Sequence, residues 1–261
     1  MLPSRLILLG STAALLLAAA PAVAQDAMPQ TQYVLDLGAG VMTKPRYDGS
    51  DSYLFSPMPI IAVGRFYIPG LGQVADGKKE MGVFFYPSFN FVGERKPSDD
   101  RDLRGTRKIN WALEAGLGAG FQGENFRVFA EVRQGFNGHK GQVGQFGADL
   151  ITRPLDRLEW SIGPRVGFAS SKYMNTYFSV SAAESAASGL ARFKAGGGFK
   201  SIGVETRFTY DLNDKVKLHL QGGYDRLIGD AGKSPLVGKV GSKDQFNIGT
   251  GLTYRFSFDV F

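Results

Sequence analysis

Few residues in this sequence have the types and the spacing that chemistry at an active site requires. The segment from Gly118 to Gly123 reads GAGFQG and has the G-x-G-x-x-G spacing of a dinucleotide-binding loop. Such a loop must open a helix whose amides face the pyrophosphate, whereas the following residues, Phe126 to Val132, alternate like a strand. We therefore predict no cofactor here and interpret these glycines as inward-facing positions where bulk is not wanted.

The possible metal ligands are also sparse, because the chain has two histidines and no cysteine. His139 lies in the turn-forming stretch NGHKG, and His219 is expected on the polar face of a strand beside Lys217 and Gln221. A metal site needs convergent ligands, and neither H-x-H nor HExxH spacing occurs. We interpret both histidines as surface or lumen side chains and predict no metal site.

Acidic residues raise the question of an enzyme. Asp99 and Asp100 lie in a charged loop, where adjacent acids are usually solvated, and Glu205 and Asp211 share one strand face with Arg207 between them. We expect these strand acids to pair with Arg207 across a polar interior. Neither histidine neighbours a serine in a motif that would activate a nucleophile. We predict that the protein is not an enzyme; a hydrolytic activity lost in Glu205→Ala and Asp211→Ala variants would show the opposite.

The elements that carry these residues are predicted from an alternation with a period of two. From Trp111 to Phe121 every second residue is apolar, and the residues between are small or polar. The same pattern recurs at residues 126–133, 160–168, 205–212, 216–221 and 251–258. Such alternation predicts strands. They run ~10 to 13 residues, which matches the ~9 to 11 that cross a bilayer and exceeds the ~5 to 6 of globular strands.

A soluble β-sandwich would alternate as well, but aromatic residues near the strand ends and inner faces of glycine and mixed charge favour a membrane barrel. The predicted fold class is all-β, a transmembrane antiparallel up-and-down β-barrel of about 12 strands, with about 10 or 14 as alternatives. Eleven strands are expected to start near Thr31, Phe55, Glu80, Ile109, Phe126, Gly141, Arg157, Ala191, Ile202, Lys215 and Asp244. The missing strand is expected at Tyr177–Val180 or, alternatively, at Arg65–Ile68.

The N-terminus has the pattern of an export signal. Arg5 precedes the apolar run Leu6–Ala20, and Ala22 and Ala24 form a small-x-small site. We predict a secretory signal peptide over residues 1–24, cleaved after Ala24, and one barrel domain over residues 25–261; a retained membrane anchor is the alternative. The net charge of +6 is spread over the chain, which does not favour a nucleic-acid partner.

The last strand contains Gly251, followed by the aromatic residues Tyr254 and Phe256 at alternating positions. This pattern resembles the C-terminal signal by which barrel assembly machinery recognises its substrates, although five residues follow Phe256. The alternative is simply an aromatic strand that faces outer-membrane lipid. Both interpretations predict the outer membrane of a Gram-negative bacterium.

Several short sequence blocks follow one another along most of the chain. They are Tyr47-Asp48-Gly49-Ser50-Asp51, Pro57-x-Pro59, Tyr173-x-x-Thr176 to Ser181, Glu184-Ser185, Ser188-Gly189-Leu190, Ala195-Gly196-Gly197, Arg226-Leu227-x-Gly229-Asp230-Ala231, Ser234-Pro235-Leu236-Val237, Gly241-Ser242-x-x-Gln245 and Gly251-Leu252-x-Tyr254-x-Phe256. Together they resemble the MltA-interacting protein (MipA)/OmpV family of outer-membrane proteins. Ser179, where the family usually has glycine, and Gly232-Lys233 depart from its pattern. The resemblance implies an outer-membrane barrel. One branch of the family is described as a scaffold between a lytic transglycosylase and a peptidoglycan synthase, and other members as adhesins or stress-linked porin-like proteins.

A scaffold and a small-solute channel therefore remain the two main alternatives. The residues expected to line the lumen lean basic, so an open pore would favour small anions. They are Glu114, Arg127, Glu131, Arg133, Arg165, Arg192, Lys194, Glu205, Arg207, His219 and Arg255. If these charges pair across the lumen, the barrel is closed and serves as a platform.

One segment is predicted to bind a partner or fold into the lumen, and strand parity places it on the periplasmic side. Its residues are Tyr177, Phe178, Ser179, Val180, Ser181, Glu184, Ser185, Ser188, Gly189 and Leu190. A family-motif loop is expected at Leu227, Gly229, Asp230, Ser234 and Pro235. The partners that these residues imply are periplasmic murein enzymes, whose capture should fall when Ala182–Ala187 are deleted.

Overall fold

The computed structural model of the protein describes residues 33–68, 72–76 and 81–259. The predicted signal peptide, residues 1–24, lies outside this part of the chain and stays a prediction. The described residues from Tyr33 onward belong to one compact unit.

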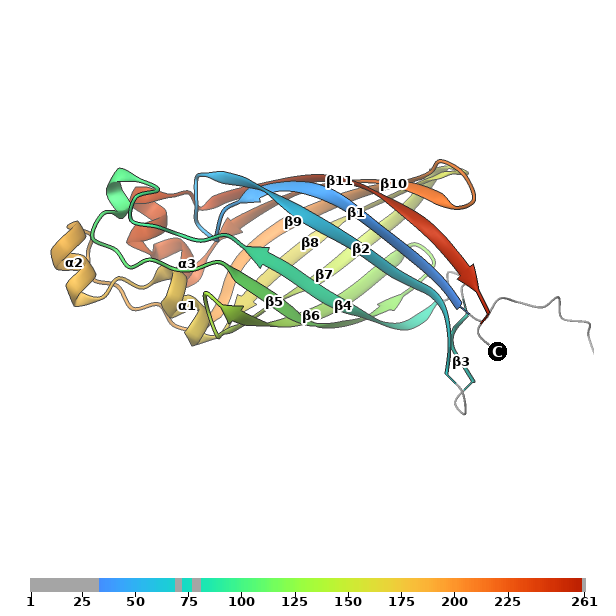
Figure 1. Ribbon diagram of the computed structural model, residues 1–261, viewed down its shortest axis with the longest axis horizontal. Helices are drawn as coiled ribbons and strands as arrows, with labels where there is room; N and C mark the ends of the chain where they lie inside the picture. The colour runs from blue at the N-terminus through green and yellow to red at the C-terminus, as the bar shows by residue number, and fades with distance from the viewer. Residues whose placement is uncertain (1–32, 69–71, 77–80, 260–261) are drawn as a thin grey trace, which may run out of the picture. The chain divides into compact units, whose positions relative to one another are not determined.

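Eleven strands of the described residues form one antiparallel sheet (Figure 1). They are β1 (Tyr33–Pro45), β2 (Tyr53–Ile68), β3 (Gly72–Asp76), β4 (Gly82–Val92), β5 (Ala112–Gln122), β6 (Phe126–Asn137), β7 (Gln142–Leu155), β8 (Leu158–Ala169), β9 (Gly198–Asp211), β10 (Val216–Leu227) and β11 (Asp244–Phe258). Their order across the sheet is β3-β2-β1-β11-β10-β9-β8-β7-β6-β5-β4. The sheet curls until residues of β2 contact residues of β4. The fold is therefore the predicted all-β up-and-down barrel.

Ten of these strands are eleven residues or longer, and the five-residue β3 only extends the hairpin at the end of β2. Ten long strands lie within the range expected from the sequence. The strand expected from Ala191 and the extra strand expected at Tyr177–Val180 are both wrong. Between these two segments, Val180 and Phe193 form an isolated bridge and no ladder. Tyr177 and Phe178 are the last residues of a helix, and their side chains are buried, so this segment does not form a strand. The alternative at Arg65–Ile68 is the end of β2.

The alternation in the sequence separates two faces of the sheet. Large apolar side chains are exposed on the outer face, among them Phe55 at 79%, Phe85 at 77% and Leu117 at 70%. Charged side chains such as Glu114 and Arg165 are buried on the inner face. Because hydrocarbon solvates apolar side chains and cannot bind free amides, this arrangement suits a bilayer around the sheet.

Several inward glycines leave room for aromatic rings on the neighbouring strand. Phe84 pairs with Gly120 and Tyr86 with Gly118 across β4 and β5, and a Cβ on either glycine would overlap the opposite ring. The ring of Phe129 covers Gly147 in the same way. The glycines therefore allow aromatic side chains to lie flat along the inner wall.

We expect Gly118→Ala to lower the free energy of unfolding by about 1–3 kcal/mol, because the new methyl group displaces a packed ring. That ring also places the Tyr86 hydroxyl 3.1 Å from Glu131 Oε2, to which it donates. Urea unfolding of the refolded protein in detergent micelles measures the change. Gly222→Ala in β10 is the matched control, since the nearest atom to its Cβ would be 3.8 Å away. Equal losses in the two variants would contradict the overlap.

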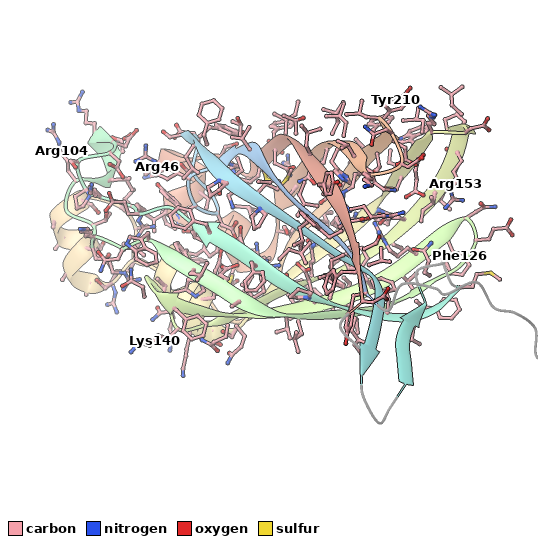
Figure 2. All side chains as sticks on the ribbon, turned by 45° about the vertical axis from the view of Figure 1, so that its right-hand side comes forward. Arg46, Arg104, Phe126, Lys140, Arg153 and Tyr210 are labelled. Atoms are coloured by element: carbon pink, nitrogen blue, oxygen red, sulfur yellow. The ribbon has the colours of Figure 1, made fainter. Side chains whose placement is uncertain are left out.

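The two ends of the barrel differ. Short turns at residues 123–125, 156–157 and 212–215 lie at one end, together with the start of β1 and the end of β11. Longer loops at residues 46–52, 93–111, 170–197 and 228–243 lie at the other end, which carries the helices. Figure 2 places Phe126, Arg153 and Tyr210 toward the short-turn end and Arg46, Arg104 and Lys140 toward the long-loop end.

The long loops contain α1 (Ser171–Phe178), α2 (Ala182–Ser188), α3 (Gly229–Lys233), a 3-10 turn at Arg101–Leu103 and a π-helical turn at Leu236–Val240. Within the described residues, no helix has the length and apolar character needed to cross a membrane.

Candidate functional site

The long loops pack a hydrophobic core over one mouth of the barrel, which we call the cap. Helix α1 supplies Tyr173, Met174, Tyr177 and Phe178, each at most 2% exposed. The strand ends beneath it supply Val92, Ala112, Val143, Ala169 and Leu227, and the other loops supply Ile109, Ala195, Ala231 and Val237. Because these strand ends come from β4, β5, β7, β8 and β10, the core extends over the mouth.

Hydrogen bonds tie the loops of the cap together. The Gly49 amide donates to Gln245 Oε1 at 3.0 Å, and the Ser242 amide donates to the Gly49 carbonyl at 3.0 Å. The Ser234 hydroxyl donates to the Phe178 carbonyl at 2.7 Å. Gly49 has a φ of 91°, a left-handed backbone conformation that favours glycine. Its backbone amide and carbonyl make the first two of these hydrogen bonds. Several sequence blocks of the family resemblance therefore meet in the cap.

A partly exposed aspartate joins the cap to the barrel wall. Asp48 Oδ2 accepts from the Tyr173 hydroxyl at 2.7 Å and from Lys200 Nζ at 2.5 Å. Burial, followed by the nearby Asp48 charge, raises the pKa of Tyr173 well above its usual value. Tyr173 therefore remains a neutral hydrogen-bond donor that fixes α1 over the lumen.

Helix α2 begins with a capping box. The Ser181 hydroxyl accepts from the Glu184 amide, and Glu184 Oε2 accepts from the Ser181 amide at 2.9 Å. Glu184 Oε1 also accepts from the Arg107 amide at 3.0 Å. Burial alone would raise the pKa of Glu184, but the Arg107 and Ser181 amides and the Arg107 charge hold it below its ordinary value. The ionised Glu184 thus joins α2 to the loop at residues 93–111.

This low pKa predicts a pH dependence of the cap. A carboxylate whose pKa is lower in the folded state stabilises that state above its ordinary pKa near 4.5, and the stabilisation disappears as the pH falls through the folded value. We expect α2 amides to exchange more slowly in the wild type than in Glu184→Gln at about pH 7, and this difference to shrink as the pH falls below 4.5. Glu124→Gln in an exposed turn is the control. A difference that persists in acid would contradict the assignment.

A first group of inner charges lies just below the cap. Glu114 is 1% exposed and accepts from Arg133 Nε at 3.1 Å, from Asn90 Nδ2 at 2.9 Å and from His139 Nε2 at 3.1 Å. Arg133 also pairs with Glu131 on the same strand. His139 is therefore a lumen side chain whose ring packs edge-on against Tyr173.

A second group continues along the inner wall from β6 to β9. Asp149 binds Arg127 Nη2 at 2.5 Å and Arg165 Nη1 at 2.7 Å. Arg165 also reaches Glu205 at 3.7 Å, and Glu205 pairs with Arg207 at 2.9 Å. The guanidinium groups of Arg127 and Arg165 both lie over the ring of Phe129. Three arginines and two carboxylates thus pair along four neighbouring strands.

A third group lies nearer the short-turn end. Arg255 donates to both carboxylate oxygens of Asp36, at 2.8 and 2.9 Å. Asp211, expected to pair with Arg207, instead lies 3.0 Å from Lys217 on the next strand. His219 lies between the hydroxyls of Thr209 and Thr253, at 3.3 and 2.9 Å.

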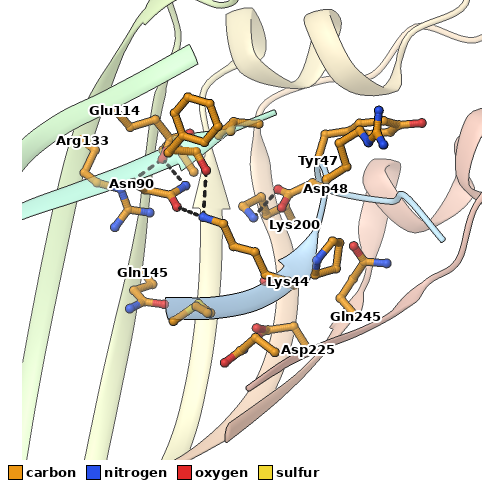
Figure 3. Close-up of a pocket in the computed structure, with 18 of the residues that line it drawn as sticks. Lys44, Tyr47, Asp48, Asn90, Glu114, Arg133, Gln145, Lys200, Asp225 and Gln245 are labelled. Carbon is orange, nitrogen blue, oxygen red and sulfur yellow. Dashed lines mark hydrogen bonds and ion pairs between the residues drawn. The ribbon is translucent and has the colours of Figure 1, made fainter. Parts of the chain in front are cut away.

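A cavity of about 290 Å³ remains between the cap and the first group of charges (Figure 3). Lys44, Asn90, Glu114 and Arg133 line one side, and Asp48, Lys200, Asp225 and Gln245 line another. Lys44 Nζ donates to Asn90 Oδ1 at 2.6 Å and to the Phe91 carbonyl at 2.7 Å. The cavity has a mixed polar and apolar lining, lies beneath the cap and is partly open to solvent. Among the described residues, no cluster of three or more His, Cys, Asp or Glu side chains could hold a metal ion.

The structure distributes the predicted site residues over these features. Glu114, Arg127, Glu131, Arg133, Arg165, Glu205, Arg207, His219 and Arg255 all lie on inward positions of the strands and make the contacts given above. Arg192 and Lys194 were expected in the lumen, but both are exposed in the loop after α2. That correction follows from the absent strand at Ala191.

The predicted partner-binding segment is part of the cap. Tyr177, Phe178, Ser179, Val180 and Leu190 are buried, and Glu184 caps α2. Ser181 precedes that helix, which contains Ser185 and Ser188, and Gly189 ends it with a left-handed φ of 74°. In the family-motif loop, Leu227 and Ser234 are buried in the cap, Gly229 and Asp230 open α3, and Pro235 precedes the π-helical turn. Gly251, Tyr254 and Phe256 lie in β11, with Gly251 inward and both rings exposed outward.

The predicted periplasmic location of that segment does not fit the structure. Residues 177–190 lie among the long loops, opposite the short turns. Bacterial barrels have short periplasmic turns and long extracellular loops, so this placement puts the segment outside. The parity count failed because it included a strand at Tyr177–Val180 that is helix and loop.

Sequence reasoning missed several partners in the site. Asp48, Lys44, Lys200 and Asp149 were not singled out, and neither was Arg95, which is fully buried and donates from Nη1 to the Tyr177 carbonyl at 2.9 Å. Burial lowers the pKa of Arg95, and the Tyr47 ring faces its guanidinium at 5.5 Å. Asp149 occupies an inward position in β7 and could have been found by extending the alternation there.

Comparison with known proteins gives the family. Residues 37–256 match the family "MltA-interacting protein MipA", which is most of the chain. The chain belongs to the MipA family. With its apolar outer face and polar lumen, this member is a β-barrel protein of the Gram-negative outer membrane. No curated protein matches the sequence.

Solved outer-membrane barrels resemble the chain only loosely. The COG4313 outer membrane channel from Pseudomonas putida F1 has 12% identity and a TM-score of 0.43, with 88% of this chain and 97% of that chain covered. Neisserial surface protein A has 11% identity and a TM-score of 0.28, with coverages of 87% and 98%. The outer membrane protease OmpT from Escherichia coli has 10% identity and a TM-score of 0.30, with coverages of 87% and 96%.

Proposed function

We propose that this MipA-family protein is a closed outer-membrane platform that holds a periplasmic murein enzyme near the membrane. The cap over the mouth is the observation that carries the proposal, because an open channel needs a continuous aqueous path. Tyr177 and Phe178 are buried in that cap, and the inner charges pair with one another. The family's name, MltA-interacting protein, supports an enzyme partner of this kind. A lytic transglycosylase, alone or together with a peptidoglycan synthase, is the proposed partner.

The short-turn end is the proposed docking face. It faces the periplasm by the rule for bacterial barrels, and its turns present Glu124, Asp156, Asp214 and Lys215 to solvent. The cap lies at the other end, so its segment at residues 177–190 is not the proposed contact. A partner bound at the turns would leave the cap undisturbed.

Capture of the proposed lytic transglycosylase by the detergent-folded protein tests this assignment. Charge reversal in the turns, with Glu124→Lys, Asp156→Lys and Asp214→Lys combined, is expected to weaken capture by about tenfold or more. Arg192→Glu with Lys194→Glu at the exposed outer loop is the matched control and should capture normally. Loss of capture in the control alone would place the partner at the wrong end for this proposal.

The channel remains the competing function, since the cavity of about 290 Å³ shows that the lumen is not completely filled. Planar-bilayer recordings of the purified protein discriminate the two. The platform predicts silent bilayers. Steady anion-selective steps in the wild type would favour the channel.

A further inference from the structure

We propose that the wall between β2 and β4 is a lateral seam that admits the acyl chain of a membrane lipid into the lumen. The seam is defined by Tyr53–Ile61 of β2 and Gly82–Val92 of β4. These strands contact each other, yet within these residues each has its ladder only on its other side, β2 with β1 and β4 with β5. This inference does not depend on the docking function.

Prolines remove hydrogen-bond donors from this seam. Pro57 and Pro59 lie opposite Val41 and Ala39 in a ladder with β1 that is unbroken from Leu35 to Pro45. Antiparallel pairs alternate between hydrogen-bonded and non-hydrogen-bonded positions. Because proline has no N–H, both must occupy non-hydrogen-bonded positions. The backbone nitrogen and carbonyl of each therefore face away from β1, toward β4.

The same reasoning applies to the opposite edge. Pro87 lies opposite Leu117 in the unbroken ladder between β4 and β5, so its nitrogen faces β2. Phe91 has the same parity as Pro87, and its carbonyl accepts from Lys44 Nζ at 2.7 Å, which shows independently that this face of β4 points into the seam. Three seam-facing positions in the middle of the two strands thus lack a donor.

Among the described residues, hydrogen bonds join the two edges toward the cap. There the Gly93 amide donates to the Arg46 carbonyl at 2.9 Å, and the Lys44 side chain bonds to Asn90 and Phe91. The ammonium group supplies donors where a backbone ladder would supply them elsewhere in the barrel. Within Tyr53–Ile61 and Gly82–Val92 no backbone ladder joins β2 to β4, in the layer where unsatisfied backbone groups are most costly.

The inner wall beside the lower part of the seam is apolar, whereas the part nearer the cap is mixed. Met58 and Ile60 occupy inward positions of β2, and Phe84 occupies one in β4. Met58 lies over Gly40 and Ile60 over Gly251, so both side chains lie along the wall. Nearer the cap, Ser56 and Ser88 are buried on the same inner faces. The outer rim of the seam is apolar, with Phe55 and Phe85 strongly exposed. An acyl chain in the lower part of the seam would find apolar surface on both sides.

The prolines also determine which kind of molecule can bind at the seam. A strand from another protein would add to a free edge through backbone hydrogen bonds, and proline at such an edge prevents this. An acyl chain makes no hydrogen bonds and needs only apolar contact. The chemistry of the seam therefore fits a lipid chain rather than an added strand.

Fluorescence quenching by acyl-chain-brominated phosphatidylcholine tests the proposal with the full chain in vesicles. The two native tryptophans, Trp111 and Trp160, are first replaced by phenylalanine. Phe84→Trp then reports from the lumen beside the seam, His219→Trp from the lumen wall on β10, and Phe85→Trp from the outer surface. We expect quenching at position 84 to exceed that at 219 by about threefold or more, because only the former is in reach of lipid chains.

The second part of the experiment restores the backbone N–H donors that the three prolines remove from the seam. In Pro57→Val/Pro59→Val/Pro87→Val, three amides can close the seam, and quenching at position 84 should fall to the level at 219 while position 85 stays quenched. If the triple variant does not fold, the comparison of positions 84 and 219 in the native seam decides alone. Equally weak quenching at both positions overturns the proposal. Strong quenching at both overturns it too, because lipid would then fill the lumen without regard to the seam.

Discussion

Glu114→Ala is expected to destabilise the folded barrel by about 3–5 kcal/mol, the cost typical of breaking a buried ion pair from one side. Glu114 is 1% exposed and is the shared acceptor of Arg133, His139 and Asn90. Its removal leaves the Arg133 guanidinium with Glu131 as its one carboxylate partner, beside the Ser88 hydroxyl, and leaves Asn90 and His139 without this acceptor. Urea unfolding in detergent micelles, followed by far-UV circular dichroism, measures the loss.

Two variants make this test specific. Glu114→Gln keeps the shape and one acceptor oxygen, so its loss should be smaller than that of alanine. Glu124→Ala removes an exposed carboxylate in the turn between β5 and β6 and should change stability by less than about 0.5 kcal/mol. If Glu114→Ala were as stable as Glu124→Ala, the inner charges would contribute little to the fold.

Phe178→Ala is expected to release the cap while the barrel stays folded. The Phe178 side chain is fully buried among Tyr173, Leu227 and Val237, and removing such a ring costs about 3–5 kcal/mol. Helices α1 and α2 have only 8 and 7 residues, so most of their stability comes from this packing and not from the helices alone. Hydrogen exchange should show loss of protection in α1 and α2 but not in β5 to β8.

The same variant is informative about permeability. A released cap opens the mouth, so bilayers that are silent with the wild type should show brief conducting events with Phe178→Ala. Asn175→Ala, an exposed position of the same helix, is the matched control and should stay silent. Unchanged exchange in Phe178→Ala would contradict the closed-mouth interpretation.

The strands could be predicted because one face of each strand contacts lipid and the other faces the polar lumen. These two environments dictate the alternation of apolar and polar residues. Residues such as Leu117 and Phe121 face lipid while Glu114 and Gly118 face the lumen, and a one-residue shift would exchange these environments. The boundaries and order of the long strands follow from this constraint. The short β3 has no such constraint over its five residues, and no alternation in the sequence predicts it.

The cap could not be predicted from alternation, although two other signals were present. Tyr173, Met174, Tyr177 and Phe178 have the i, i+1, i+4, i+5 spacing of one helix face. Ser181 followed by Glu184 is the spacing of a capping box. The aromatic run at Tyr177–Val180 also has high β propensity, and burial against strand ends far along the chain decided in favour of the helix.

The lumen partners depended on register, which the sequence does not specify across loops. Glu205 meets Arg207 as expected, since both lie on one strand. Asp211 pairs with Lys217 because the β9–β10 ladder places them opposite each other. Asp48 meets Lys200 across 152 positions of the chain, a distance over which no local pattern operates.

The ion pair between Arg255 and Asp36 has a consequence for how the molecule is built. The pairs along β5 to β10 join strands that follow one another in the chain, so each can form as soon as its own hairpin zips together. Arg255 and Asp36 are 219 positions apart and meet only when the first strand reaches the last. Loop closure over such a span is slow compared with hairpin formation. This ion pair therefore forms late, when the barrel closes. An Asp36→Asn variant, which lacks the ion pair, should accumulate as an intermediate whose barrel is not closed and which urea extracts from the membrane.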